Sequence, residues 1–263
     1  MRAYWELAVS GYRRYATYRG ATLAGAFTNS VFGLMRGYVL LAIVAGRPRV
    51  GGYDAADTLT YVWLVQGLLM VAYLWGWNDL ALRVISGDIV VDLGRPVDLQ
   101  GAWLAADLGR AAYHTIFRGL PPVLLAELLF RLDLPADPLL WLAFAVSVAL
   151  AAVVSFSARF LVNLCAFWLL DYRGILSMSS LIGTFLSGSV VPLPFLPGGV
   201  RAVVEVLPFS AMLQLPIDVL LGKHRGLDLA GALLFQLTWA LALLGLGRLV
   251  LAAGVRRLVV QGG

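Results

Sequence analysis

The side chains that most often carry enzymatic or metal chemistry are sparse in this sequence. Histidine occurs only at His114 and His224, in separate segments, and the single cysteine, Cys165, lies inside an apolar run. The sequence contains no GxxxxGK phosphate loop followed by Ser or Thr, no HExxH or CxxC metal spacing and no GxSxG nucleophile turn. We therefore expect no covalent chemistry, no metal and no cofactor in this chain.

The unusual charged stretch is ISGDIVVDLGRPVDLQ, residues 85–100. It places four charged residues between long apolar runs: Asp88, Asp92, Arg95 and Asp98. A short helix is predicted, with Ser86 or Asp88 as its N-cap, and Gly94 would end it. The segment is either an ordinary turn on the membrane surface or a docking element. Because an anionic leaflet repels acidic segments, docking on a protein is the more economical interpretation.

The elements that would position these residues follow from the hydropathy. Of the 263 residues, 60% are hydrophobic and 13% are charged, which is too apolar for a soluble domain. We predict an all-α membrane protein with one permease-like domain over residues 1–263. The six predicted transmembrane helices cover about residues 23–45, 59–77, 108–130, 139–170, 175–191 and 229–251. The third is expected to bend at Pro121-Pro122.

Residues outside these spans complete the predicted topology. Residues 1–22 combine four Tyr and a Trp with arginines that reach headgroups, so an interfacial helix is expected rather than a cleavable signal peptide. Residues 192–216, broken by prolines and glycines, are expected to form outer re-entrant helices. The excess of arginine on one side predicts a plasma-membrane protein with both termini cytoplasmic. The basic residues lie at span ends, which argues against nucleic-acid binding.

Two polar groups lie within the predicted spans. The first shares one face of span one and contains Asn29, Gly33 and Arg36, with Arg36 expected to face protein or water because a central arginine is costly in lipid. The second follows helical spacing in span five and contains Ser177, Ser180, Thr184 and Ser187. Both groups either line a translocation pathway or only pack helices, since hydroxyls also bond to their own helix carbonyls. Arg110, in span three, is expected to snorkel at the membrane boundary.

Two stretches carry a resemblance to a known family. SGDIVVDLGRPVDL resembles the segment between the second and third spans of the type-2 ABC export permeases. FLSGSVVPLPFLPGGVRAVVEVLPFSAMLQLPIDVLLG is similar to that family's exit from span five, its proline-rich outer region, its Leu-Pro-Phe turn and its closing Pro…Gly. With the N-terminal helix and six spans, the resemblance covers nearly the whole chain.

The resemblance implies a function. In this family residues 79–100 would be the cytoplasmic coupling segment that seats in an ATPase, and its docking residues would be Gly87, Asp88, Ile89, Asp92, Leu93, Arg95 and Pro96. ATP and Mg would be bound by that separate ATPase, in two copies. Spans one and five would meet a second permease, either a similar paralogue or the same chain, and would line the export route.

The sequence thus predicts the permease subunit of an ATP-driven exporter. The aromatic-rich, sparsely charged spans suggest an amphipathic or hydrophobic compound as the cargo. A non-transporting membrane scaffold is the alternative function. An intramembrane enzyme is disfavoured because no nucleophile is paired with a base.

Overall fold

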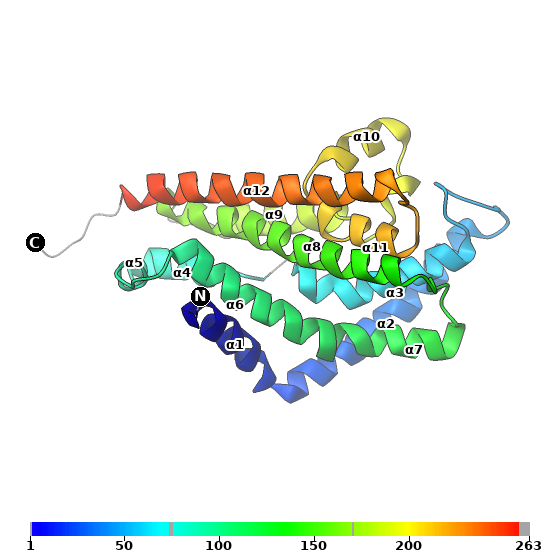
Figure 1. Cartoon of the computed structure of the whole chain (residues 1–263), viewed down its shortest axis with the longest axis horizontal. Coiled ribbons are helices and arrows are strands. Elements are labelled where there is room, and N and C mark those ends of the chain that lie inside the picture. The colour runs from blue at the N-terminus through cyan, green and yellow to red at the C-terminus, as the bar shows by residue number, and fades with distance from the viewer. Residues whose placement is uncertain (1, 74–75, 170, 258–263) are drawn as a thin grey trace, which may run out of the picture.

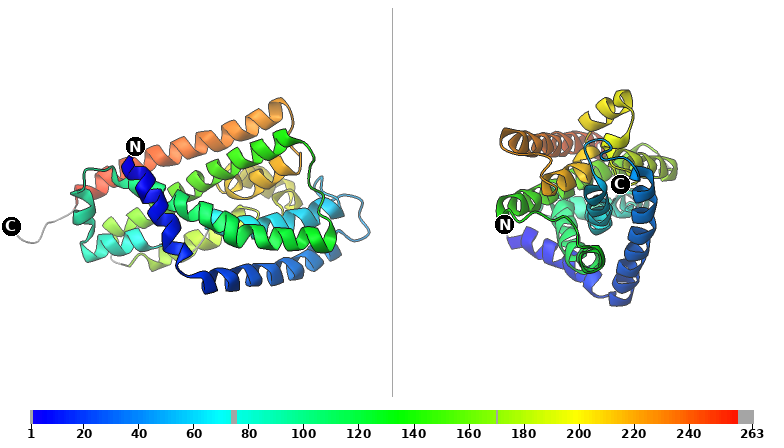
Figure 2. Two further views of the ribbon diagram at one scale, coloured as in Figure 1. Left: turned by 60° about the horizontal axis from the view of Figure 1, so that its bottom comes forward. Right: turned by 90° about the vertical axis from the view of Figure 1, so that its right-hand side faces the viewer.

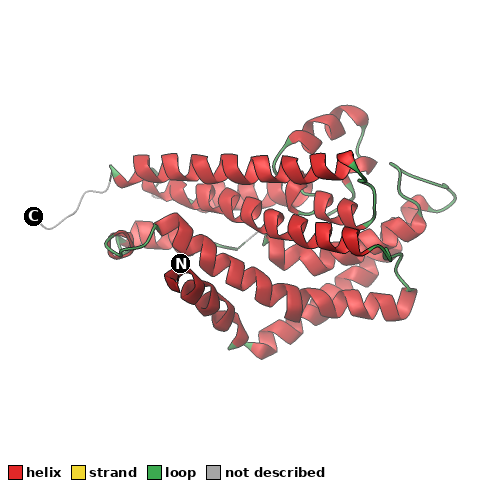
Figure 3. Cartoon of the chain, viewed as in Figure 1, coloured by secondary structure: helices red, strands yellow, loops and turns green. Residues whose placement is uncertain are grey.

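The computed structural model describes residues 2–73, 76–169 and 171–257, and in that part of the chain the regular elements are helices (Figure 3). The all-α prediction is confirmed. Four helices are long and apolar enough to cross a membrane: α2 (Arg19–Val44), α3 (Ala55–Ala72), α8 (Pro138–Leu164, extended by a 3-10 turn to Phe167) and α12 (Leu227–Val255). They correspond to the first, second, fourth and sixth predicted spans.

The third predicted span is an interrupted helix. It consists of α6 (Leu99–His114), a π-helical turn (Thr115–Gly119) and α7 (Leu120–Phe130). The interruption lies just before Pro121-Pro122, where the bend was predicted, and the prolines occupy the first turn of α7. A proline has no N–H to give to the preceding turn, and a π-turn is one way in which a helix accommodates a local break in its hydrogen bonding.

The fifth predicted span is shorter than expected. Helix α9 runs from Arg173 to Leu186, which is 14 residues against the predicted 175–191. At 1.5 Å per residue such a helix is roughly 21 Å long, less than the ~30 Å hydrocarbon core. The chain turns after Leu186 because Gly188 adopts a positive φ of 84°. The four long helices therefore account for four of the six predicted spans.

The two ends of the bundle differ in content (Figures 1 and 2). One end holds the start of α1 (Arg2–Ala16), α4 (Asp79–Ser86), α5 (Ile89–Leu93) and the last described turn of α12. The opposite end holds the α2–α3 loop, α10 (Gly198–Val206) and α11 (Gln214–Leu220). The predicted coupling segment thus lies at the same end as the start of α1.

Helix α1 packs along α6 through two glycines. A Cβ on Gly109 would lie 1.8 Å from the carbonyl oxygen of Ala8, and one on Gly11 would lie 2.0 Å from that of Ala106. Only residues without a side chain permit this approach of two backbones. Helix α1 ends at Ala16, so the predicted interfacial helix of residues 1–22 is shorter and is docked on the protein as well as exposed.

The outer region is tied to α3 by a buried polar network. Tyr61 donates to the Gly188 carbonyl and to Gln214 Oε1, each at 2.7 Å. Gln214 Nε2 bonds both carboxylate oxygens of Asp218 at 3.0 and 2.9 Å, and Tyr53 donates to Asp218 as well. The network gives the buried polar groups of Gly188, Gln214 and Asp218 hydrogen-bond partners, as irregular buried backbone requires.

Candidate functional site

The predicted coupling segment forms a compact knob made of α4, α5, the turn that joins them and the turn that follows α5. Gly87 joins the two helices with φ 81°, a conformation that favours glycine. The knob exposes apolar side chains, and Val91 is 61% exposed. The exposed residues of the knob include four apolar side chains of the helices and five residues of the turns: Leu82, Ile85, Val90, Val91, Gly87, Asp88, Gly94, Arg95 and Pro96.

Two of the predicted docking residues point inward instead. Ile89 is 0% exposed and packs with Leu80 and Phe160. Asp92 is buried and accepts hydrogen bonds from Arg83, with its Oδ1 also 3.7 Å from Arg95 Nη1. The prediction that they contact a partner directly is therefore revised. They hold the knob together, because a five-residue helix has too few internal hydrogen bonds to persist alone.

The knob is anchored to α8 and α1. Asn163 of α8 accepts from the Ala81 backbone N–H at 3.0 Å and donates to the Trp77 carbonyl at 3.1 Å. Arg14 of α1 donates to Asp79 at 2.9 Å. This hydrogen bond raises the pKa of Arg14, while burial acts in the opposite direction. The knob therefore moves with the two helices on which it sits.

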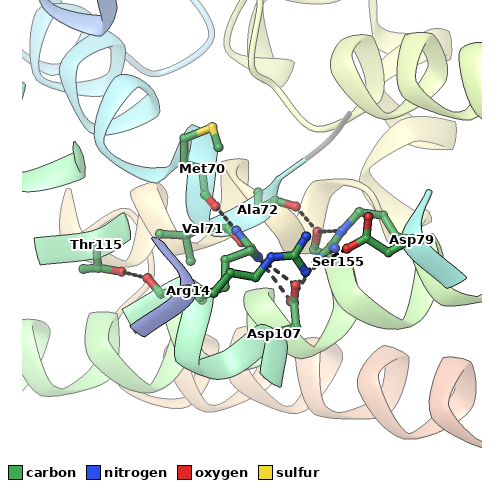
Figure 4. Close-up of polar contacts among 11 residues, drawn as sticks. Arg14, Met70, Val71, Ala72, Asp79, Asp107, Thr115 and Ser155 are labelled. Carbon is green, nitrogen blue, oxygen red and sulfur yellow. Dashed lines mark hydrogen bonds and ion pairs between the residues drawn. The ribbon is translucent and has the colours of Figure 1, made fainter. Parts of the chain in front are cut away.

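A buried ion cluster lies one turn along α8 from Asn163, which anchors the knob; Figure 4 shows its contacts. The Asp107 carboxylate lies between two guanidinium groups, accepting from Arg110 Nε at 2.7 Å and from Arg159 Nη2 at 2.9 Å. Their side chains are 5%, 3% and 10% exposed, respectively. Both guanidinium groups also lie over the Tyr73 ring, at 4.5 and 5.2 Å from its centre. We call Asp107, Arg110 and Arg159 the ion cluster.

The ion cluster also terminates α3. Arg110 donates to the carbonyls of Met70 at 2.5 Å and Val71 at 3.2 Å, and Ser155 donates to that of Ala72. The last carbonyls of a helix have no partner within the helix and carry partial negative charge, so a cation there is favourable. Three helices, α3, α6 and α8, thus meet at one group of charges.

The sequence interpretation missed this cluster. Arg110 was expected to snorkel toward headgroups, whereas it is 3% exposed and fully engaged inside the protein. The available signal was the spacing of Asp107 and Arg110, which places both on one side of a helix. Their pairing with Arg159, 52 residues away along the chain, depends on how α6 and α8 pack.

The polar residues of span one separate into two directions. Asn29 donates to the Gln66 carbonyl of α3 at 3.1 Å, and a Cβ on Gly33 would lie 2.6 Å from the Trp63 ring. Arg36 is half-buried and donates to the Ser189 carbonyl at 2.8 Å. Arg36 therefore connects α2 to the turn after α9, while the other two pack α2 onto α3.

The hydroxyls of α9 bond mostly to their own helix. Thr184 donates to the Ser180 carbonyl at 2.7 Å, and the Ser187 hydroxyl lies 3.4 Å from the Thr184 carbonyl. Ser180 lines a small hollow beside Arg159, and Ser187 is buried. Among the described residues there is no group of three His, Cys, Asp or Glu side chains that could hold a metal.

Comparison with known proteins gives one match. Residues 33–262 match a protein-family model described as "ABC-2 family transporter protein". The matched range includes the knob, the ion cluster and the outer region. Searches of curated proteins and of solved structures found no significant match.

Proposed function

The chain belongs to the ABC-2 family of transporter membrane proteins, and from this premise we propose that it is the permease subunit of an ATP-driven exporter. Cytosolic ATPase subunits supply the energy, since ABC-2 permeases generally pair with them. The cargo is an amphipathic or hydrophobic compound that leaves the cell. The observation that carries the proposal is the knob, an exposed and mainly apolar surface that includes Asp88 and Arg95, at the end of the bundle that holds the start of α1.

The knob has the features of a docking element. Val90 and Val91 offer apolar area that water would otherwise solvate, and Asp88 offers a carboxylate for a cation on the ATPase. The internal pair of Arg83 and Asp92 keeps this surface in one conformation before binding, which lowers the entropic cost of association. ATP and Mg bind on the ATPase in this arrangement.

A second permease, either a paralogue or another copy, would complete the translocation route. Support comes from two exposed apolar faces that one protomer leaves uncovered. On α2 these include Phe27, Met35 and Tyr38, and on α9 Met178, Leu181 and Phe185. Lipid covers such faces in isolated spans, so assembly need only exchange lipid for protein.

The test is retention of the co-expressed ATPase on the purified permease. The double variant Asp88→Lys with Val91→Asp places charge on the exposed knob surface without touching its buried base. We expect retention to fall tens-fold or more, because lost charge pairs at an interface cost ~2–5 kcal/mol. Glu6→Lys, an exposed carboxylate on α1, is the matched charge-reversal control and should retain the ATPase. Equal retention by both variants would refute the docking role and favour a scaffold.

A further inference from the structure

A half-open cavity lies between α8, α9 and α12. It has a volume of about 240 Å³, and its walls are mainly apolar. The apolar wall is formed by Ala158, Leu161, Val162, Phe209, Met212 and Leu243. A small hollow adjoins it and shares Arg159, Val162 and Ser179 with it. We call the two together the side chamber; its wall is mainly apolar, and Arg159 lines both parts.

The charged residue of the chamber wall is Arg159 of the ion cluster. Two arginines share the single carboxylate of Asp107, so the cluster has a net formal charge of +1, which the α3 carbonyls bonded by Arg110 offset only in part. A buried charge without a counter-charge is costly, and an anion in the chamber would lower that cost. In the described part of the chain no other acidic side chain pairs with Arg159.

Helix α9 forms one wall of the chamber through Ser179 and Gly183. Gly183 is the one buried residue of α9, and it lines the cavity. The opposite face of α9 carries exposed Met178, Leu181 and Phe185. A helix buried over so little of its surface separates from its neighbours at low cost, since few apolar contacts are lost.

We propose that this side chamber binds a single-chain anionic amphiphile, with the acyl chain along the apolar wall and the anionic head at Arg159. Charge and apolarity both select this class: the apolar wall excludes a fully polar anion, and the positive charge of Arg159 disfavours a cationic amphiphile. The proposal deepens the proposed function by naming the class of cargo, and it rests on that function only for transport. Binding itself requires no ATPase activity.

The experiment is photo-crosslinking of the purified full-length permease complex without nucleotide. A dodecanoic acid carrying a diazirine on its chain is the probe, and crosslinked peptides are mapped by mass spectrometry. We expect labelling of the chamber wall near Leu161, Met212 and Leu243. Dodecyl phosphate should compete roughly tenfold or more better than dodecanol, because hydrogen bonds to a charged group contribute ~1.5–3 kcal/mol. Competition by dodecyl phosphate would show that the site accepts a phosphate head as well as a carboxylate. The cationic dodecyltrimethylammonium should compete no better than dodecanol.

A matched pair of variants locates the site. Ser179→Phe fills the chamber from α9 and should abolish labelling. Ser177→Phe makes the same change on the exposed side of the same helix and should label normally. Labelling unchanged by Ser179→Phe, or equal competition by the neutral and anionic compounds, would overturn the proposal. Absence of an ATPase from the purified complex would instead contradict the proposed function and leave the crosslinking result to decide this inference.

Discussion

Asp107→Asn is the substitution that should test the ion cluster most directly. The wild-type carboxylate accepts hydrogen bonds from Arg110 at 2.7 and 3.2 Å and from Arg159 at 3.3 and 2.9 Å. An asparagine keeps the shape but raises the net charge of the cluster from one positive charge to two. Removing one partner of a buried ion pair typically costs ~3–5 kcal/mol, because the remaining charge is left uncompensated.

The assay is thermal unfolding of the detergent-purified permease at one fixed scan rate. With ~2–4 °C per kcal/mol for a chain of this size, the apparent Tm should fall by roughly 6–20 °C. Asp88→Asn is the matched control, because that carboxylate is exposed on the knob, and its Tm should stay near the wild-type value.

A double variant separates charge from packing. Asp107→Asn combined with Arg159→Met returns the cluster to one positive charge, on Arg110, which keeps its bonds to Met70 and Val71. The double variant should therefore be more stable than Asp107→Asn alone, a non-additivity expected for residues in one network. Equal Tm values for wild type and Asp107→Asn, or a strictly additive double variant, would refute the charge argument.

Two further predictions concern packing and pH. Gly109→Leu should destabilise the protein by ~1–3 kcal/mol and expose α1 to proteolysis, because the new side chain would clash with the Ala8 backbone. Gly245→Leu is the control: a Cβ there meets nothing within 4 Å, so neither the stability nor the proteolysis of α1 should change. Burial raises the pKa of Asp218 from 3.8 to about 6, against the hydrogen bonds that lower it. The protonated acid therefore favours the folded state, so the stability that Asp218 contributes is full below pH 3.8 and is lost, by ~3 kcal/mol, as the pH rises from 3.8 through 6. Asp218→Asn should flatten this slope in thermal unfolding between pH 4 and 7, and an unchanged slope would contradict the assignment.

The sequence predicts the parts of the fold that depend on local composition. Long apolar runs identify α2, α3, α8 and α12, and the family resemblance of residues 86–99 and 185–222 agrees with the family match. The side chains of the knob were harder to predict. Its apolar and acidic residues are close in sequence, and only the packing of α4 on α8 decides that Ile89 and Asp92 turn inward while Val91 turns outward.

The hydropathy pattern could not predict where α9 ends, nor could it predict the pairing in the ion cluster, for a related reason. Residues after Leu186 remain apolar, so hydropathy extends the span, whereas the chain turns at Gly188, whose carbonyl is held by Tyr61. Asp107 likewise has two candidate cations whose distances depend on helix packing. In both cases a contact distant in sequence outweighs the local signal.

The position of Arg159 connects the proposed coupling and binding sites. Four residues along α8 from Arg159, Asn163 holds the first turn of α4, so the base of the knob and the charged residue of the chamber lie on neighbouring turns of one helix. Arg110 joins the same cluster to the end of α3, from which the chain enters the knob. A displacement of the knob therefore acts on the helix turn that positions the guanidinium. Because the cluster is buried and charged, small movements change its electrostatic energy substantially. ATPase closure on the knob would thereby alter how strongly the chamber holds an anionic head.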